Sequence, residues 1–236
     1  MNEINHVFTV LYNAYGPQYW WPVTHNDEIY PKYTGGPKTE KQQLEVMFGA
    51  ILTQNTSWSN VEKAITNLNK KNLFDIEKII SIKECLLAEI IRPSGYFNQK
   101  AKKLKALCIF LNEHSIKYLE KKDVHVLREM FLSINGIGPE TADSIILYAF
   151  NKPSFVIDAY TKRIFSRIGL CDNKISYHNL KEMFEENLDI SFDNLFDIVK
   201  IYNEYHALIV EHAKQYCRKK PLCKECILND VCRKRI

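Results

Sequence analysis

The chain has 236 residues, of which 46% are hydrophobic and 25% are charged, a composition typical of a globular protein with one large or two small domains. No apolar run approaches the roughly 18 residues that a membrane-spanning helix needs, and the acidic, aromatic start MNEINHVFTVLYNAY is unlike a signal peptide. We therefore expect a soluble, cytoplasmic protein without a membrane partner, and a monomer by default.

The net charge of +4 is small, but its distribution along the chain is uneven. Residues 214–236 carry eight Lys or Arg and two acidic residues, so the rest of the chain is close to neutral. A basic tail on a near-neutral body suggests a polyanionic partner. The alternative is a tail that only improves solubility.

Apolar residues recur at helical spacing along the whole chain. In chain order, this spacing predicts helices around residues 8–15, 44–51, 61–68, 104–111, 142–149 and 180–184. Alternating strand patterns are nearly absent, and the segment SFVI at 154–157 is too short to count as one. The prediction is therefore an all-α protein.

The segment GPQYWWPVTH, residues 16–25, places Trp20 next to Trp21 in a chain that has only three tryptophans. One interpretation is core packing, for one of the two or for both. The other is a wall for a nucleobase, because flipped bases stack on aromatic side chains and tryptophan offers the best face to a cationic base.

A tight hairpin is predicted within LSINGIGPETADSIILYAF, residues 132–150. Gly136 and Gly138 permit positive φ and close backbone approach, and Pro139 suits the first turn of the next helix. The free N–H groups of such a hairpin form a site for a phosphate-sized anion. A plain corner between two helices is the alternative.

Asp158 ends an apolar segment and precedes a helix that carries Lys162 and Arg163. A helix N-cap is the simple interpretation of this aspartate, and a capping aspartate can also be catalytic. Further along the chain, His206 is expected to be a buried histidine satisfied in the core.

Four cysteines close the chain with the spacing C-x5-C-x2-C-x5-C: Cys217, Cys223, Cys226 and Cys232. Four thiolates this close in sequence can enclose a tetrahedral zinc ion or a [4Fe-4S] cluster, and spacing alone does not decide between them. A disulfide is not expected in an intracellular protein. Cys85, Cys108 and Cys171 stand singly among apolar residues and are expected in the core.

Together, the hairpin GIGPETAD, the segment VIDAYTKR and the cysteine tail resemble the helix-hairpin-helix (HhH-GPD) DNA glycosylases, in particular the endonuclease III branch with its C-terminal iron–sulfur loop. The resemblance implies two helical domains that flank a cleft for double-stranded DNA containing damaged bases. One domain would be residues 39–154, with the helix-hairpin-helix at about 128–150. The other would be residues 1–38 plus 155–236, with the cluster loop at 217–232.

The resemblance also assigns a cofactor and phosphate contacts. The family usually shows C-x6-C-x2-C-x5-C around a [4Fe-4S] cluster, so this chain is one residue short in the first gap; one cluster is the prediction and zinc the alternative. The residues expected to meet DNA phosphates lie in the hairpin, in the helix after Asp158 and in the cysteine loop: Gly136, Gly138, Thr141, Lys162, Arg163, Lys219 and Lys220.

Glu140 bears on the chemistry of the resembled family. In bifunctional members a lysine at this position attacks the sugar and then cleaves the strand. A carboxylate cannot form that Schiff base, so the resemblance implies a monofunctional glycosylase with weak or absent lyase activity. Asp158 matches the catalytic aspartate, whose charge stabilises an oxocarbenium-like sugar.

The order of WWP, LTQNT and a following aromatic residue is similar to the 3-methyladenine glycosylases of this branch. The implied pocket consists of Trp20, Trp21, Pro22 and Trp58, and either Gln54 or Asn55 fills the gap left by the flipped base. The prediction is monofunctional removal of alkylated purines, with 3-methyladenine as the leading substrate. The alternatives are a glycosylase for oxidised or mismatched bases, an endonuclease III-like glycosylase and lyase, and a non-catalytic DNA-structure-binding protein.

Overall fold

The protein is described by a computed structural model that covers residues 2–26, 28–188 and 198–234. Within these ranges the regular structure is helical, and the one strand-like pairing is an isolated antiparallel bridge between Val23 and Lys32. The prediction of an all-α protein is confirmed. No described helix combines the length and the apolar character that a membrane crossing requires.

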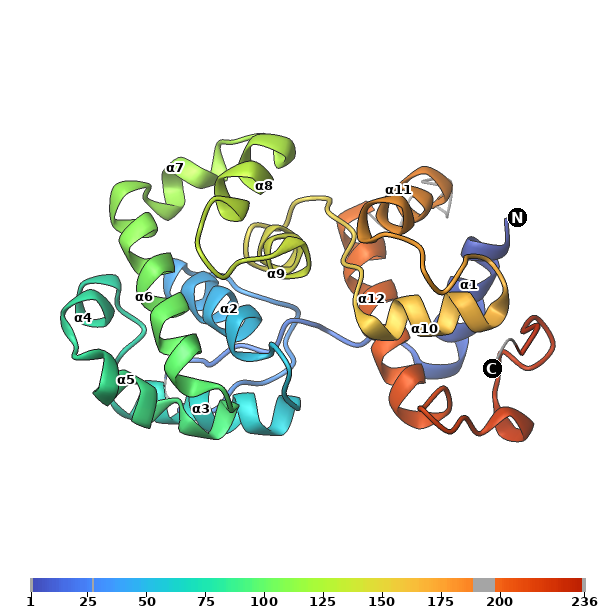
Figure 1. The fold of residues 1–236 in the computed structure, drawn as a ribbon, viewed down its shortest axis with the longest axis horizontal. Helices are drawn as coiled ribbons and strands as arrows, with labels where there is room; N and C mark the ends of the chain where they lie inside the picture. The colour runs from blue at the N-terminus through green and yellow to red at the C-terminus, as the bar shows by residue number, and fades with distance from the viewer. Residues whose placement is uncertain (1, 27, 189–197, 235–236) are drawn as a thin grey trace. The chain divides into compact units, whose positions relative to one another are not determined.

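Contacts within the chain define two compact units (Figure 1). Unit 1 comprises Met1–Gln18 with Pro153–Ile236, and unit 2 comprises Tyr19–Lys152. Residues 19–38, which the sequence analysis assigned to the part that carries the cysteines, pack with unit 2 instead. The reason is local: Trp21 is buried against Trp58 and Tyr148, both of unit 2.

Unit 2 is a set of helices packed around α2 (Glu40–Leu52), whose residues from Leu44 to Leu52 are all buried. The other elements are α3 (Trp58–Lys70), α4 (Ile76–Ser81), α5 (Glu84–Ile90), η1 (Arg92–Ser94), α6 (Phe97–Glu113), α7 (Ile116–Glu120), α8 (Val124–Leu132), α9 (Pro139–Ser144) and the π-helical turn η2 (Ile145–Ala149). Helices α3, α6 and α9 contact α2 directly, as does η2. A helix covered on all sides is apolar all round, which explains why α2 carries few charged residues.

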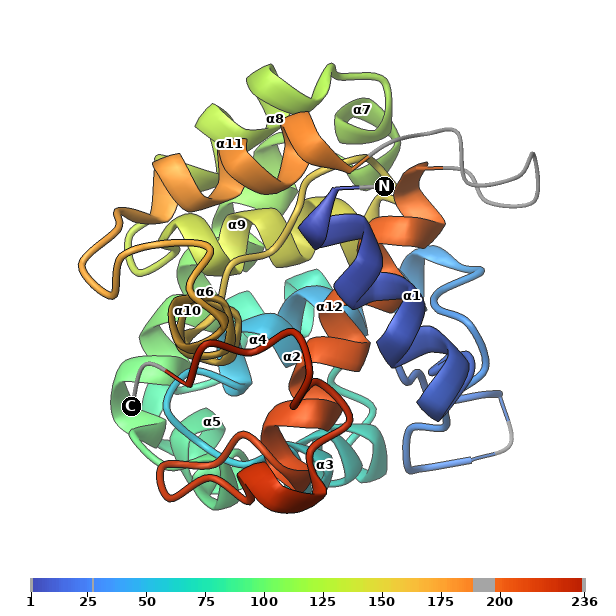
Figure 2. The ribbon, with the colours of Figure 1, turned by 90° about the vertical axis from the view of Figure 1, so that its right-hand side faces the viewer.

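Unit 1 is built around α12 (Ile198–Gln215), against which α1 (Glu3–Tyr15) and α10 (Ala159–Ile168) pack (Figure 2). It also contains α11 (Tyr177–Asn187) and the short η3 (Cys223–Glu225). Its core is aromatic: Phe155 stacks on Phe184 with ring centroids 4.3 Å apart, and Phe165 meets Phe184 edge to face. Tyr205 lies among these rings, fully buried, and donates its hydroxyl to the Ile4 carbonyl at 2.7 Å.

The helices lie where the sequence predicts them, whereas two other features differ from the prediction. Each predicted apolar repeat falls in a helix, and SFVI is extended without pairing. However, the helix predicted at 142–149 changes from α to π at Ile145, a change that apolar periodicity does not indicate. The core position expected for Cys85 is wrong, because Cys85 is exposed, whereas Cys108 is buried and Cys171 lies between the two.

Candidate active site and cysteine-lined cavity

The hairpin joins α8 to α9, with Gly138 as the N-cap of α9 and Pro139 as its first residue, as predicted. Gly136 has φ of +91°, and a Cβ there would lie 2.5 Å from Cγ of Lys103. Gly138 differs: its φ is −94° and a Cβ would meet nothing within 4 Å. The sequence allowed a positive φ at both glycines, and of the two only Gly136 adopts one. Gly138 is exposed to solvent.

A buried ion pair joins the two helices of the hairpin motif. Arg128 of α8 donates from Nε to Oδ1 of Asp143 at 2.8 Å and from Nη2 to Oδ2 at 3.2 Å. The Asp143 side chain is completely buried. Bidentate pairing of this kind fixes orientation as well as charge, so it sets the geometry of α8 against α9. The only sign of this pair in the sequence is an aspartate within an apolar helix, and it was not predicted.

Gln54, in the turn after α2, ties three elements of unit 2 together. Its Nε2 donates to the Thr141 hydroxyl at 2.9 Å and to the Gly136 carbonyl at 3.3 Å, and its Oε1 accepts from Lys103 at 2.5 Å. Thr141 is buried, so its hydroxyl serves this internal contact. The neighbouring Asn55 is exposed and has a left-handed backbone, with φ of +55°.

The predicted pocket aromatics come together in unit 2. The rings of Trp21 and Trp58 meet edge to face at 5.5 Å, and Trp20 lies 6.3 Å from Tyr148. Trp21 is only 5% exposed, whereas Trp20 is half-buried. Among the described residues, the buried Nε1 atoms of Trp21 and Trp58 have no hydrogen-bond partner. Pro22 is buried next to them. The aromatic cluster is thus Trp20, Trp21, Trp58 and Tyr148.

The segment that carries the two tryptophans is anchored at Thr24. Glu45 of α2 accepts from the Thr24 N–H at 2.9 Å and from its hydroxyl at 2.8 Å. The Gln42 side chain donates to the Thr24 carbonyl at 3.0 Å, and Asn69 donates to its hydroxyl at 2.9 Å. Burial raises the pKa of Glu45 to about 7, although the bonds from Thr24 oppose the rise.

Asp158 is the N-cap of α10, as predicted. Its Oδ1 accepts from the Thr161 N–H at 2.7 Å and from the Thr161 hydroxyl at 2.9 Å, and its Oδ2 lies 3.5 Å from Nε2 of His206. Burial alone would raise the pKa of the Asp158 carboxyl. His206 and Thr161 outweigh that effect and hold the pKa below its usual value. Asp158 is therefore a buried carboxylate that stays ionised at neutral pH.

The backbone that leads into Asp158 is also held by side chains. Lys181 of α11, itself buried, donates to the Ser154 hydroxyl at 2.9 Å, and Glu185 accepts from the Phe155 N–H at 2.8 Å. These bonds hold the irregular segment before Asp158, and the cap of α10 holds the carboxylate itself, so Asp158 is fixed from both sides.

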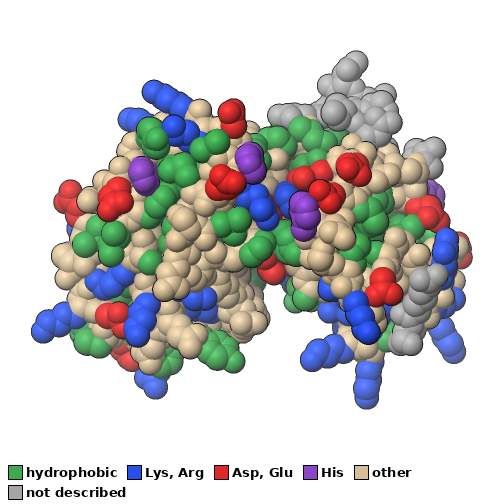
Figure 3. Space-filling view, turned by 45° about the horizontal axis from the view of Figure 1, so that its top comes forward, with side chains coloured by type: hydrophobic (Ala, Val, Ile, Leu, Met, Phe, Trp, Pro, Cys, Tyr) green, Lys and Arg blue, Asp and Glu red, His purple; other side chains and the backbone are tan. Residues whose placement is uncertain are grey.

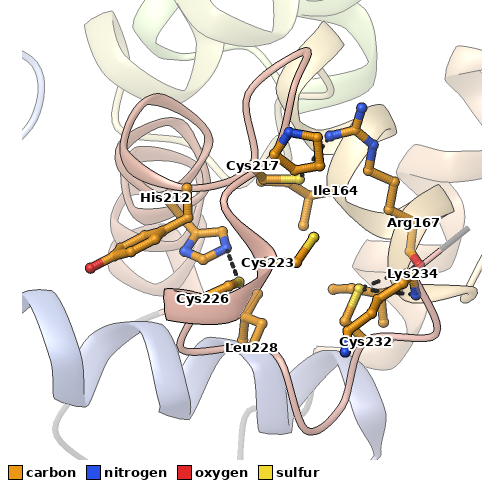
Figure 4. A pocket seen from close by; sticks show the side chains of 12 residues that line it. Ile164, Arg167, His212, Cys217, Cys223, Cys226, Leu228, Cys232 and Lys234 are labelled. Atoms are coloured by element: carbon orange, nitrogen blue, oxygen red, sulfur yellow. Dashed lines mark hydrogen bonds between the residues drawn. The ribbon is translucent and has the colours of Figure 1, made fainter. Parts of the chain in front are cut away.

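The four cysteines line one cavity in unit 1, with their sulfur atoms around a common space (Figure 4). Arg167 donates to the Cys217 sulfur at 3.4 Å, His212 lies 3.4 Å from the Cys226 sulfur, and the Tyr15 hydroxyl lies 3.0 Å from Nδ1 of His212. Burial lowers the pKa of His212 to about 4. Burial, with the other thiols as a smaller cause, raises the pKa of Cys226.

The donor set fits a group with four thiolate ligands. Within the described residues, no three His, Cys, Asp or Glu side chains converge tightly enough to hold a single metal ion as they stand. Four thiolates lining one cavity are a donor set that suits either a tetrahedral zinc ion or a [4Fe-4S] cluster.

The basic residues predicted to contact DNA fall into two groups, those that bond the protein itself and those that are exposed. Lys162 donates to the Ile175 carbonyl at 2.6 Å, and Arg163 donates to the Cys217 carbonyl at 2.8 Å. Lys219 and Lys220 are exposed on the cysteine loop, and Lys and Arg side chains project from the lower edge of the right-hand unit in Figure 3. Glu140 is exposed in the first turn of α9.

The sequence profile of the HhH-GPD superfamily of base excision DNA repair proteins matches residues 48–189, which include the hairpin and Asp158. The chain belongs to this superfamily. The family resemblance drawn from the sequence is confirmed, and at the coarse level the chain is an HhH-GPD DNA glycosylase of base excision repair.

Among curated HhH-GPD relatives, a protein of Methanocaldococcus jannaschii, named as a candidate DNA repair glycosylase, is 46% identical over 230 residues, covering 96% of this chain and 94% of its own. An endonuclease III of Sulfolobus acidocaldarius is 26% identical over 189 residues, covering 79% and 80%.

Solved HhH-GPD structures agree with the fold. The H. pylori 3-methyladenine DNA glycosylase bound to 1,N6-ethenoadenine is 29% identical, with a TM-score of 0.72 over 91% of this chain and 98% of that one. A trapped covalent complex of endonuclease III with DNA has a TM-score of 0.75 over 99% and 97% of the two chains at 17% identity, which speaks for the fold alone.

Proposed function

We propose that the chain is a monofunctional DNA glycosylase that flips alkylated purines, foremost 3-methyladenine, out of double-stranded DNA and hydrolyses the N-glycosidic bond. The observation that carries this proposal is the buried, ionised Asp158 in a chain whose hairpin bears a carboxylate, Glu140, and no amine at the corresponding position.

Asp158 supplies the charge that the reaction needs. As the base leaves, the sugar becomes an oxocarbenium-like cation, which a nearby carboxylate stabilises. A group fixed in a site shielded from water does this more effectively than a solvated one, because it need not reorganise. The lowered pKa of Asp158 keeps it in the charged form that this role requires.

Glu140 makes strand cleavage by the usual covalent route impossible at its position. A Schiff base requires an amine nucleophile, whereas Glu140 presents a carboxylate from the first turn of α9. The product is therefore an intact abasic site. In this role Glu140 also complements the positive end of the helix dipole.

The aromatic cluster supports a cationic base as the substrate. Alkylation at a purine ring nitrogen adds a positive charge, which the face of an indole attracts. Trp20 and Trp58 are the half-buried members of the cluster, and we place the base against Trp20 with the buried Trp21 behind it. The similarity to a solved 3-methyladenine DNA glycosylase supports the same substrate class.

The structure favours Asn55 over Gln54 as the residue that fills the gap left by the flipped base. Gln54 is committed to Thr141, Gly136 and Lys103 within the protein. Asn55 is exposed at a left-handed turn and can enter the duplex without breaking an internal network.

For phosphate contacts, we favour the open hairpin at Gly138 and the exposed Lys219 and Lys220. Lys162 and Arg163 already donate to backbone carbonyls of unit 1, so we assign them first to holding the loop at Ile175 and the cysteine loop. Thr141 serves Gln54 through its hydroxyl.

We propose that Cys217, Cys223, Cys226 and Cys232 bind one [4Fe-4S] cluster, with zinc as the alternative. When bound, the cluster cross-links the C-terminal loop through its iron–thiolate bonds. The chain's own residues prepare the loop: Arg167 donates to Cys217, and His212, held neutral by burial and contacted by Tyr15, lies beside Cys226. Glycosidic hydrolysis itself uses none of these residues.

The test is base release from methylated duplex DNA, followed by analysis of the strands with and without alkali. We expect free 3-methyladenine and strand breaks only after alkali. Breaks without alkali would mean that another residue supplies lyase chemistry, and release only from oxidised or mismatched substrates would move the specificity to those lesions.

The Asp158→Asn variant tests the proposed role of Asp158 directly. It should bind lesion-containing DNA with near-normal affinity and lose base release by a factor of roughly 100 or more, because the neutral amide cannot stabilise the sugar cation. Binding measured by fluorescence anisotropy and single-turnover release on the same DNA separate the two effects. Near-normal release by this variant would refute the role of Asp158, and binding without release by the unaltered protein would point to a DNA-structure-binding protein.

A further inference from the structure

His206 has a more specific place than that of a core histidine. It lies on α12, which packs against α10, and only 7% of its side chain is exposed. Its Nε2 points at Oδ2 of Asp158 from 3.5 Å. That distance is longer than a well-formed hydrogen bond, and hydrogen bonds within catalytic groups often tighten only when substrate is bound.

The two oxygens of Asp158 have different duties. Oδ1 accepts two hydrogen bonds from Thr161 and caps α10. Oδ2 is the oxygen that remains for the reaction, and among the described residues His206 is the side chain that faces it. The direction of that oxygen therefore depends on two elements, the cap of α10 and the imidazole of α12.

We propose that His206 is a positioning residue that acts through Asp158: its Nε2–H hydrogen-bonds Oδ2 and fixes the plane of the carboxylate for the developing sugar cation. This inference rests on the proposed role of Asp158. An imidazole N–H suits the task, because it donates a hydrogen bond in a direction that the packing of α12 against α10 fixes. The second ring nitrogen has no part in this contact.

A merely structural histidine makes a different prediction. If His206 only fills space, its replacement lowers stability and leaves the rate of base release unchanged. His206→Leu and His206→Gln would then have the same rate, although only the glutamine side chain offers an N–H donor. The neighbouring Tyr205 provides the comparison, since it is buried on the same helix and its hydroxyl bonds the backbone of α1 at Ile4 and Phe8.

The experiment compares His206→Leu, His206→Gln and the control Tyr205→Phe in single-turnover base release, at a temperature at which circular dichroism shows all three folded. We expect His206→Leu to lower the rate by roughly 10- to 100-fold with unchanged affinity for lesion DNA, in the range seen when a group that orients a functional ligand is removed. The amide N–H of His206→Gln should restore most of the rate. Tyr205→Phe should lose stability and keep its rate.

Any of these kinetic outcomes overturns the inference: a normal rate in His206→Leu, an equal loss in His206→Leu and His206→Gln, or an equal loss in Tyr205→Phe. Asp158→Asn is measured in parallel to separate the two proposals. If Asp158→Asn is inactive while His206→Leu is normal, only the role of His206 fails. If Asp158→Asn still turns over, the role of Asp158 fails and that of His206 with it.

A double-mutant cycle of His206 and Asp158, measured by unfolding, tests the contact without catalysis. The absence of coupling between the two residues would also overturn the proposal.

Discussion

At the scale of single residues, the protein places two buried carboxyl groups in opposite electrostatic settings. Asp158 faces His206 and the donors of Thr161, and its pKa is held below the usual value despite burial. Glu45 faces hydroxyl and amide groups, and burial dominates, raising its pKa to about 7. Environments that push carboxyl pKa values apart are a mark of functional sites. Here the ionised group is the proposed catalyst, and the group that resists ionisation anchors the tryptophan segment.

Glu45 gives a pH-dependent prediction. Its folded pKa, about 7, lies above the value of about 4.3 for an unfolded chain, so the folded state holds the proton longer. Stability should therefore fall as pH rises from about 4.3 to about 7 and then level off. Glu45→Gln keeps an acceptor for Thr24 without a charge, and should be more stable than the unaltered protein by up to roughly 3 kcal/mol at pH 8 and nearly equal to it at pH 4.5.

Urea unfolding followed by tryptophan fluorescence measures this effect, because all three tryptophans, Trp20, Trp21 and Trp58, belong to unit 2, as Glu45 does. The exposed Glu113→Gln in the same unit is the control. A stability difference between Glu45→Gln and the unaltered protein that stays constant from pH 4.5 to 8 would contradict the expectation.

The sequence predicted those residues whose function follows from local order. Asp158 caps a helix that begins directly after it, and Trp20 and Trp21 are adjacent. It did not indicate the contacts of His206 with Asp158 or of Glu45 with Thr24, because each joins residues that only the tertiary fold brings together.

At the scale of elements, the two glycines of the hairpin differ in how much a side chain would disturb them. Gly136→Ala forces a methyl group into the Lys103 stem at a φ of +91°, and should destabilise unit 2 by roughly 1–3 kcal/mol. Gly138→Ala meets no neighbour at a φ of −94°, so its stability should change by about 0.5 kcal/mol or less. If DNA approaches the open hairpin, Gly138→Ala should instead lose DNA affinity.

Urea unfolding and anisotropy titrations on the same two proteins distinguish these effects. Equal stability of the two variants would show that Lys103 yields to a methyl group at little cost. Unchanged DNA affinity of Gly138→Ala would remove the hairpin from the proposed phosphate contacts.

Apolar periodicity in the sequence predicted the positions of the helices. It did not predict the contacts that determine the shape of the hairpin. The Arg128–Asp143 pair, the Gln54 network and the π-helical turn after Ser144 each depend on how α8, α9 and α2 meet. Periodicity specifies which face of a helix is buried and leaves open which polar groups are buried with it.

At the scale of the whole molecule, the two units have separate cores, and the cysteine loop is anchored in one of them. Arg163 and Arg167 donate to carbonyls of Cys217 and Arg218, and the Arg233 N–H donates to the Ile168 carbonyl. All of these partners belong to unit 1. The sequence located the loop from four cysteines but could not show that α10 and α12 receive it.

Loss of the proposed cluster should therefore loosen unit 1 selectively. In Cys226→Ser, which removes one ligand, we expect the roughly four irons of a [4Fe-4S] cluster to be lost. Amide hydrogen exchange should rise in α10 and in the C-terminal turns of α12 and stay unchanged in α2 and α6. Cys108→Ser, which places a hydroxyl in the core of unit 2, is the mirror control and should raise exchange there with the iron retained. Faster exchange in both units of Cys226→Ser would show that the loop supports the whole chain, and zinc without iron in the unaltered protein would replace the cluster by the tetrahedral alternative.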